Sequence, residues 1–283
     1  MSMNWFMNWF LEMSVPTMFH FFVLPNVKNS SLQEPFLKSC LKSRSNVPLM
    51  VRAWYGSIGF VVILMEILHL TGALQMNTLG ETLFTGGLVK YPAPIPATTE
   101  WMRLFMNATL GLGVVYLFSA ITGNPHLVRP VMLAQFSWGL ANLLAVCTGA
   151  MSMNWFMNWF LEMSVPTMFH FFVLPNVKNS SLQEPFLKSC LKSRSNVPLM
   201  VRAWYGSIGF VVILMEILHL TGALQMNTLG ETLFTGGLVK YPAPIPATTE
   251  WMRLFMNATL GLGVVYLFSA ITGNPHLVRP VML

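Results

Sequence analysis

Long apolar segments alternate with short polar ones along the whole chain. Four such segments fall within the first 150 residues, at 1–24, 47–74, 101–122 and 130–148. Each is long enough to cross most or all of a bilayer core of about 30 Å. Lipid offers no hydrogen-bond partners to the backbone, so each segment is predicted to be a helix. Turn residues support these divisions, among them Asn46 and the Gly123-Asn124-Pro125 stretch.

The chain repeats itself with a period of 150 residues. Residues 1–133 recur without a change as residues 151–283, and the uncharged segment 134–150 lies between them. Identity over this length indicates a recent duplication, an engineered tandem, a polyprotein or an assembly artefact, rather than an old duplication with adapted halves. The second copy has apolar segments at 151–174, 197–224 and 251–272.

The pattern therefore predicts an all-α, polytopic transmembrane helical bundle. About seven spans come from a tandem repeat of four helices, with copy 1 at 1–150 and a shorter copy 2 at 151–283. All four kinds of segment occur once, without interruption, in residues 47–174. This stretch is predicted to be the most complete four-helix unit.

Composition supports the membrane assignment. Hydrophobic residues make up 54% of the chain and charged residues only 9%, with a mean hydropathy of +0.58. Soluble domains carry about 25% charged residues, so an ordinary soluble protein is excluded. Three cysteines exclude a disulfide scaffold. The net charge of +6 comes largely from loops between apolar segments, which is typical of membrane topology and not of nucleic-acid binding.

The distribution of basic residues predicts the orientation. The loop at 25–47 carries three lysines and Arg44 against Glu34 alone, whereas the loop between the second and third segments has no basic excess. Because loops rich in Lys and Arg remain in the cytoplasm, loop 25–47 is predicted to be cytoplasmic. The pattern indicates a multi-pass integral membrane protein and does not distinguish between organelles.

Polar residues recur within the predicted spans and define a candidate intramembrane polar cluster. Its members are Glu66, His69, Arg103, Asn107, Gln135, Asn142, Asn154, Asn158, Glu162 and His170. Lipid cannot satisfy such groups, so they are expected to face the bundle interior. One interpretation is interhelical hydrogen bonding, worth about 1 kcal/mol per bond. The other is a proton relay or a site for a polar substrate.

Cofactor chemistry has little support in the sequence. The spacing of Glu66 and His69 matches the Glu-x-x-His motif of di-iron bundles, but each period supplies one such motif and one further acid, so no metal is predicted. No catalytic residue can be assigned and no cofactor is predicted, although quinone or haem is left open. Glycines such as Gly59 and Gly113 are expected to permit close helix approach rather than ligand binding.

The segment order, the short Asn124-Pro125-His126 turn and the almost loop-free last hairpin resemble small four-span membrane proteins of the DoxX-like type. The stretch from Gly123 to Arg129, with Arg103 before it, is more loosely similar to the ergosterol-biosynthesis scaffold family. That family has an Arg-Thr-Phe-Gly pattern where this chain has Arg-Leu-Phe-Met at 103–106. Both resemblances imply an accessory or scaffolding membrane protein more than an enzyme.

Two hypotheses for the function follow. The first is a non-enzymatic accessory or scaffolding four-helix unit in the lipid bilayer, with a membrane-protein partner or a second copy of itself. The second is a membrane oxidoreductase or proton-coupled carrier that works through Glu66, His69, Arg103 and Glu162. Neither hypothesis involves nucleic acid.

Overall fold

The computed structural model describes residues 47–149 and 197–278, except 86, 88–89, 92, 94, 236, 238–239, 241–242, 244 and 275–276. The predicted segments 1–24 and 151–174 lie outside this part, and with them Asn154, Asn158, Glu162 and His170. The described part is helical and contains no strand. Its helices are α4 (Leu49–Leu70), α5 (Met76–Thr85), α6 (Pro96–Thr122), α7 (Pro125–Cys147), α11 (Leu199–Leu220), α12 (Met226–Thr235) and α13 (Pro246–Thr272).

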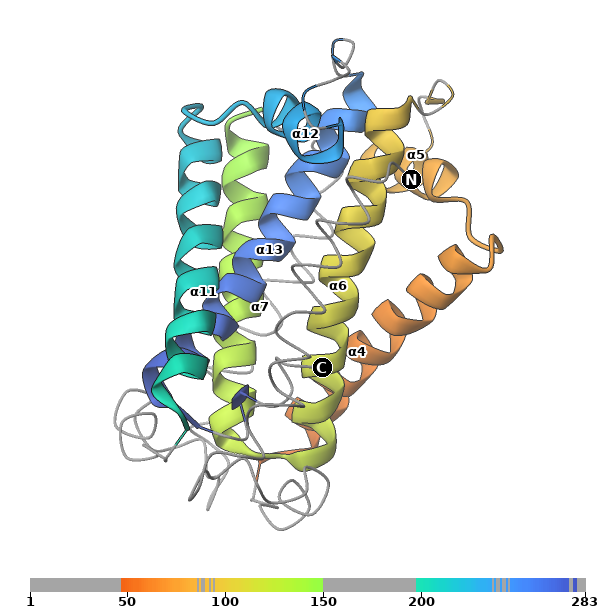
Figure 1. Ribbon diagram of the computed structural model, residues 1–283. Coiled ribbons are helices and arrows are strands. Elements are labelled where there is room, and N and C mark those ends of the chain that lie inside the picture. The colour runs from red at the N-terminus through yellow and green to blue at the C-terminus, as the bar shows by residue number, and fades with distance from the viewer. Residues whose placement is uncertain are drawn as a thin grey trace.

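Five of the described helices are long and apolar enough to cross a membrane: α4, α6, α7, α11 and α13. The short helices α5 and α12 lie at the same end of the bundle (Figure 1). This arrangement fits a multi-pass integral membrane protein, as the sequence predicts. The prediction of seven spans includes two segments outside the described residues.

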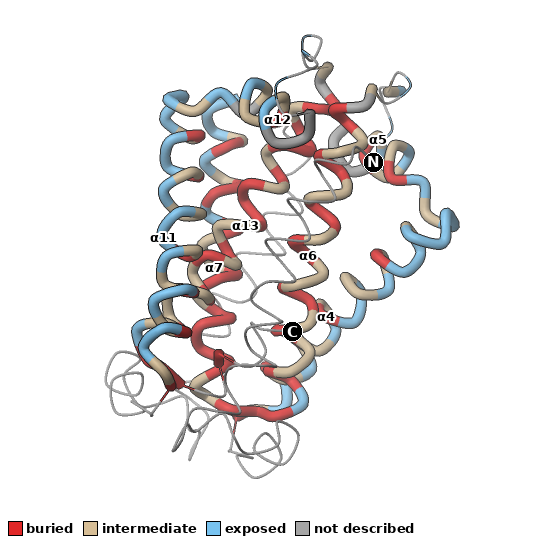
Figure 2. Tube along the Cα trace, in the orientation of Figure 1, coloured by how far each residue is buried: buried red, intermediate tan, exposed pale blue. Residues whose placement is uncertain are grey.

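The three helices α6, α7 and α13 form the centre of the bundle. Helix α4 packs on α6, and α11 packs on α13, so the outer helix of each copy stays with the inner helix of the same copy (Figure 1). Burial is concentrated on the central helices, whereas α4 and α11 have few buried residues (Figure 2). Their outward faces carry large apolar side chains, including Phe60 and Phe210, which are 61% and 62% exposed. These faces are suited to contact lipid.

Glycines bring α4 and α6 into close contact, as the sequence predicts. A Cβ atom added at Gly59 would lie 2.7 Å from the carbonyl oxygen of Gly113 and 2.8 Å from the amide nitrogen of Leu117. Gly209 meets Gly263 in the same way, at 2.7 Å, in the second copy. Small residues let two backbones approach this closely, which is the usual means of helix packing in lipid.

The helix bounds differ from the predicted segments in two places for the same reason. Helix α6 begins at Pro96 rather than at 101, and α7 begins at Pro125 rather than at 130. Proline favours the first helical position because its missing N–H has no intrahelical partner there and its φ is already helical. Asn124 caps α7 by accepting a hydrogen bond from the amide of His126 at 2.9 Å. The two prolines therefore start these helices instead of lying in the loops before them.

The other differences are smaller. Helix α4 covers 49–70 within the predicted segment 47–74, and α7 ends one residue before the predicted 148. The loop after α4 contains α5, a helix of 10 residues that the hydropathy pattern did not predict.

Candidate functional site

The two copies meet along α6 and α13, and the contact is symmetric. The hydroxyl oxygens of Thr98 and Thr248 lie 2.6 Å apart in a buried hydrogen bond. These residues are 150 positions apart, so they occupy the same place in the two copies. A residue that meets its own counterpart lies next to a two-fold axis. Helices α6 and α13 are therefore related by a local two-fold axis near this pair.

Reciprocal aromatic pairs extend the same symmetry. The rings of Trp101 and Phe255 are 5.7 Å apart between centroids, and those of Phe105 and Trp251 are 5.6 Å apart. Both tryptophans are fully buried. Such pairs contribute about 0.5–1.5 kcal/mol each beyond their burial. The contact between the copies thus combines matched aromatic packing with a hydrogen bond.

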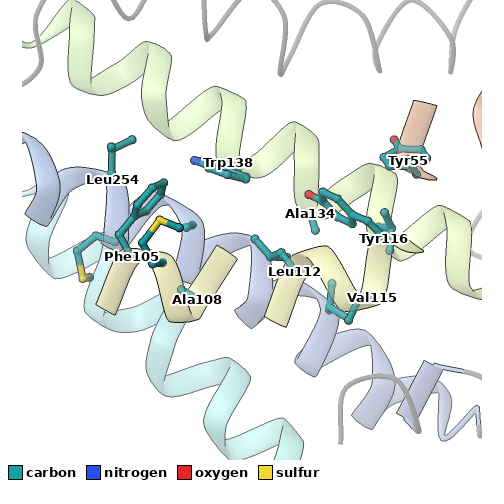
Figure 3. Packing of buried hydrophobic residues seen from close by; sticks show 14 of the residues in the cluster. Tyr55, Phe105, Ala108, Leu112, Val115, Tyr116, Ala134, Trp138 and Leu254 are labelled. Carbon is teal, nitrogen blue, oxygen red and sulfur yellow. The ribbon is translucent and has the colours of Figure 1, made fainter. Parts of the chain in front are cut away.

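Helix α7 belongs to the first copy in sequence but packs mainly along α13 of the second copy. Asn257 of α13 donates a hydrogen bond to the side-chain oxygen of Asn142 at 2.5 Å. The hydroxyl of Tyr116 on α6 donates to the side-chain oxygen of Gln135. Figure 3 shows Trp138 of α7 beside Leu254 of α13. Helix α7 therefore contacts both central helices and joins the two copies.

The candidate residues Gln135 and Asn142 both belong to this contact. Each is buried, with 1% and 0% of its surface exposed. They are seven residues apart, which places them two turns apart on one face of α7. Their carboxamides are used for helix–helix hydrogen bonds.

A second group of candidate residues lies near the last turn of α4. Glu66 is buried at 3% exposure, on the face of α4 that also carries Tyr55 and Gly59. Arg103 of α6 is close enough to His69 for its charge to act on the imidazole. The structure thus brings His69 and Arg103 together, and Asn107 lies one turn further along α6.

The corresponding residues of the second copy are more deeply buried. Glu216 is 1% exposed and His219 is 6% exposed, and Arg253 of α13 acts electrostatically on both. Among the described residues, neither carboxylate oxygen of Glu216 has a hydrogen-bond partner. The same holds for Nε2 of His219. Ionisable groups in such a position are costly in a membrane.

Sequence reasoning missed several residues of these sites. Glu100 and Glu250 lie just after the first turns of α6 and α13, near Arg103 and Arg253, but the predicted helix began after them. Thr98 was missed for the same reason. The signal that could have found them is the proline at 96, which is typical of a first helical position.

Arg52 has a structural partner that the sequence did not suggest. Its Nε donates to the carbonyl oxygen of Ala120 at 2.7 Å, and its Nη2 donates to that of Ile121 at 3.1 Å. The last carbonyls of a helix have no intrahelical partner, and a cation at this end is favourable. Arg52 thus fixes the start of α4 to the end of α6.

Among the described residues, no group of three or more His, Cys, Asp or Glu could hold a metal ion. The chain matches no protein-family model, no curated protein and no solved structure.

Proposed function

We propose that the protein is a non-enzymatic scaffold of the membrane, in which two copies of one helical unit hold each other side by side. The observation that carries this proposal is the two-fold contact of α6 with α13, made by the Thr98–Thr248 hydrogen bond and the two reciprocal aromatic pairs. An interface in which the same surface is used twice is typical of self-assembly.

The chemistry of the buried polar groups supports the same function. Lipid is as apolar as a leucine side chain, so helices associate in it through close packing and interhelical hydrogen bonds. Gln135, Asn142 and Asn257 are all engaged in such bonds. The resemblance of the segment order to DoxX-like proteins, and of Gly123–Arg129 to the ergosterol-biosynthesis scaffold family, is further support for an accessory role.

Separation of the two halves tests the scaffold function. A protease site is inserted between Ser180 and Cys190, and the purified protein is cleaved in mild detergent. The halves should remain together on size exclusion. Replacement of Phe105, which is buried, and Phe255, which is half-buried, by alanine should weaken their association, since loss of a buried Phe costs about 3–5 kcal/mol.

The matched control replaces Phe60 and Phe210, which are exposed on the outward faces of α4 and α11. This variant should keep the halves together, because both side chains are largely exposed and little burial is lost. If the halves separate in the parent protein, or if both double variants behave alike, the α6–α13 contact is not the scaffold.

A proton-coupled carrier is the second candidate, and one observation favours it. Glu216 and His219 are buried at the end of α11. Among the described residues, the carboxylate oxygens of Glu216 and Nε2 of His219 have no hydrogen-bond partner. Such groups are often functional within a membrane. Proteoliposomes loaded with a pH-sensitive dye would show proton uptake that the Glu66→Gln and Glu216→Gln double variant abolishes. A purified protein that retains a quinone or haem chromophore would instead favour an oxidoreductase.

A further inference from the structure

The contact between the two copies is made by one surface that meets itself. Helices α6 and α13 have the same 27-residue sequence. We name the contact residues the α6 surface (Thr98, Trp101 and Phe105) and the α13 surface (Thr248, Trp251 and Phe255). Thr98 meets its own counterpart, whereas Trp101 and Phe105 each meet the counterpart of the other. This is an isologous arrangement, in which a surface is its own partner.

The chemistry of the α6 surface allows it to meet itself. None of its three side chains carries a charge, so the contact brings no like charges together. Thr98, Trp101 and Phe105 are spaced by three and four residues, which places them on one face of α6. Both threonines and both tryptophans are completely buried, at 0% exposure. Either threonine hydroxyl can be the donor, so each surface supplies both a donor and an acceptor.

The two copies also present this surface on the same local backbone. Helix α6 ends at Gly123 with φ 58° and ψ 28°, and α13 ends at Gly273 with φ 57° and ψ 28°. The close glycine contact with the outer helix, at 2.7 Å, is the same in both copies. Neither the sequence nor the local backbone of the α13 surface therefore distinguishes it from a matching surface on another chain.

We infer that the α6–α13 contact is interchangeable between chains, and that the partner it fits is the same surface on a second copy of this protein. This inference rests on the proposed scaffold function and names the partner of its contact. Covalent connection within one chain raises the effective concentration of each surface for the other to about the millimolar range. The intact chain therefore satisfies both surfaces internally. A chain that loses one surface keeps the other without its internal partner, and a second such chain supplies the match.

A disulfide next to the two-fold axis tests the inference with the full chain. The three cysteines are replaced by serine, and Thr98→Cys is introduced on the α6 surface. The α13 surface is removed by Trp251→Ala and Phe255→Ala. The protein is purified in mild detergent, oxidised and separated on a gel without reductant. The cysteines of two chains should meet as Thr98 meets Thr248, and should give a covalent dimer.

The matched controls keep the cysteine and change the surfaces. Thr98→Cys with an intact α13 surface should give at least about fivefold less dimer, because the internal contact has the higher effective concentration. Removal of Trp101 and Phe105 in addition to the α13 surface should reduce the dimer to the background level. Phe60→Cys measures that background, since Phe60 is 61% exposed on the outward face of α4 and reports random encounters.

A reciprocal variant keeps the test valid if the first variant fails to fold. Thr248→Cys with Trp101→Ala and Phe105→Ala should dimerise through position 248 in the same way. A milder variant combines Thr98→Cys with Phe255→Ala alone, because Phe255 is only half-buried. This variant should give an intermediate amount of dimer.

A chain with both Thr98→Cys and Thr248→Cys calibrates the assay, because its internal disulfide should form without dimer. If that disulfide forms but no variant with one surface removed exceeds the Phe60→Cys background, the inference is wrong and the scaffold proposal stands. The inference is also wrong if the chain that lacks both surfaces dimerises as well as the chains that lack one. Failure of the internal disulfide would remove the α6–α13 contact itself, and with it both proposals.

Discussion

Asn257 donates a hydrogen bond to Asn142 at 2.5 Å, and this bond connects a helix of one copy to a helix of the other. Both side chains are completely buried. Asn107, the counterpart of Asn257 in the first copy, is only half-buried. One sequence position therefore has two different environments within one chain, and this provides matched variants for experiment.

The first prediction compares these two asparagines. Asn257→Leu should lower the free energy of unfolding by about 1 kcal/mol or more, because it removes an interhelical hydrogen bond and leaves the Asn142 carboxamide buried without it. Asn107→Leu should have a much smaller effect. Unfolding in mixed micelles of mild detergent and dodecyl sulfate measures both. Equal losses would mean that α7 does not distinguish between α6 and α13.

The second prediction concerns the close approach of α4 and α6. Gly59→Ala should destabilise the protein by about 1–3 kcal/mol, because the new Cβ would lie 2.7 Å from a backbone oxygen that cannot move independently of its helix. The gain of about 1 kcal/mol in helix propensity does not offset this clash.

Gly111→Ala is the control for this prediction. A Cβ at Gly111 has its nearest neighbour, a methyl group of Leu262, at 3.7 Å, which is an ordinary contact. The Gly111 variant should unfold at the same temperature as the parent or slightly above it. If Gly59→Ala is equally harmless in a thermal-unfolding assay, the two helices do not approach as described.

The spans could be predicted from sequence because hydropathy alone marks a segment that must be helical in lipid. Their ends could not, because Pro96 and Pro125 are compatible with both a loop and a first helical turn. The predicted positions erred toward the loop at both sites. Helix α5 was missed because its 10 residues have too little apolar length for the hydropathy pattern to detect.

The partners of the polar residues were beyond sequence analysis for a different reason. Gln135 and Asn142 were selected because they are polar within a span, and both are buried in helix contacts. The pairing of Asn142 with Asn257 could not be chosen over a pairing with Asn107, because the two asparagines have identical neighbours in sequence. Only the packing of α7 in three dimensions distinguishes them.

The third prediction concerns Arg52 at the end of α6. Arg52→Leu removes two hydrogen bonds to carbonyls that no helical amide can satisfy, and its side chain is partly exposed, so the cost should be about 1–2 kcal/mol. Arg52→Lys should retain part of this stability through its charge near the helix end. Arg202 makes the same bonds in the second copy, at 2.7 and 3.0 Å.

Arg202→Leu should therefore cost a similar amount, and the double variant should lose about the sum, since the two sites share no partner. Thermal unfolding in detergent would show this additivity. A double variant no less stable than either single one would mean that these arginines do not connect the helices.

The last prediction concerns the pH dependence that Tyr91 confers from its position between α5 and α6. Burial raises the pKa of Tyr91 above its usual value, and the nearby carboxylates of Glu250 and Glu81 raise it further. The unfolded chain ionises this phenol at about pH 10, whereas the folded protein keeps it protonated to a higher pH. Because the folded state then binds more protons, its stability is complete below about pH 10 and falls as the pH rises toward the pKa of the folded state.

Tyr91→Phe should therefore reduce the loss of stability between pH 10 and higher values, measured by denaturation at each pH against the parent. Absorbance at 295 nm should show one phenol fewer in the late part of the titration. If the phenol lost in the Tyr91→Phe variant is one that ionises near pH 10 in the parent, the loop does not bring Tyr91 close to Glu250.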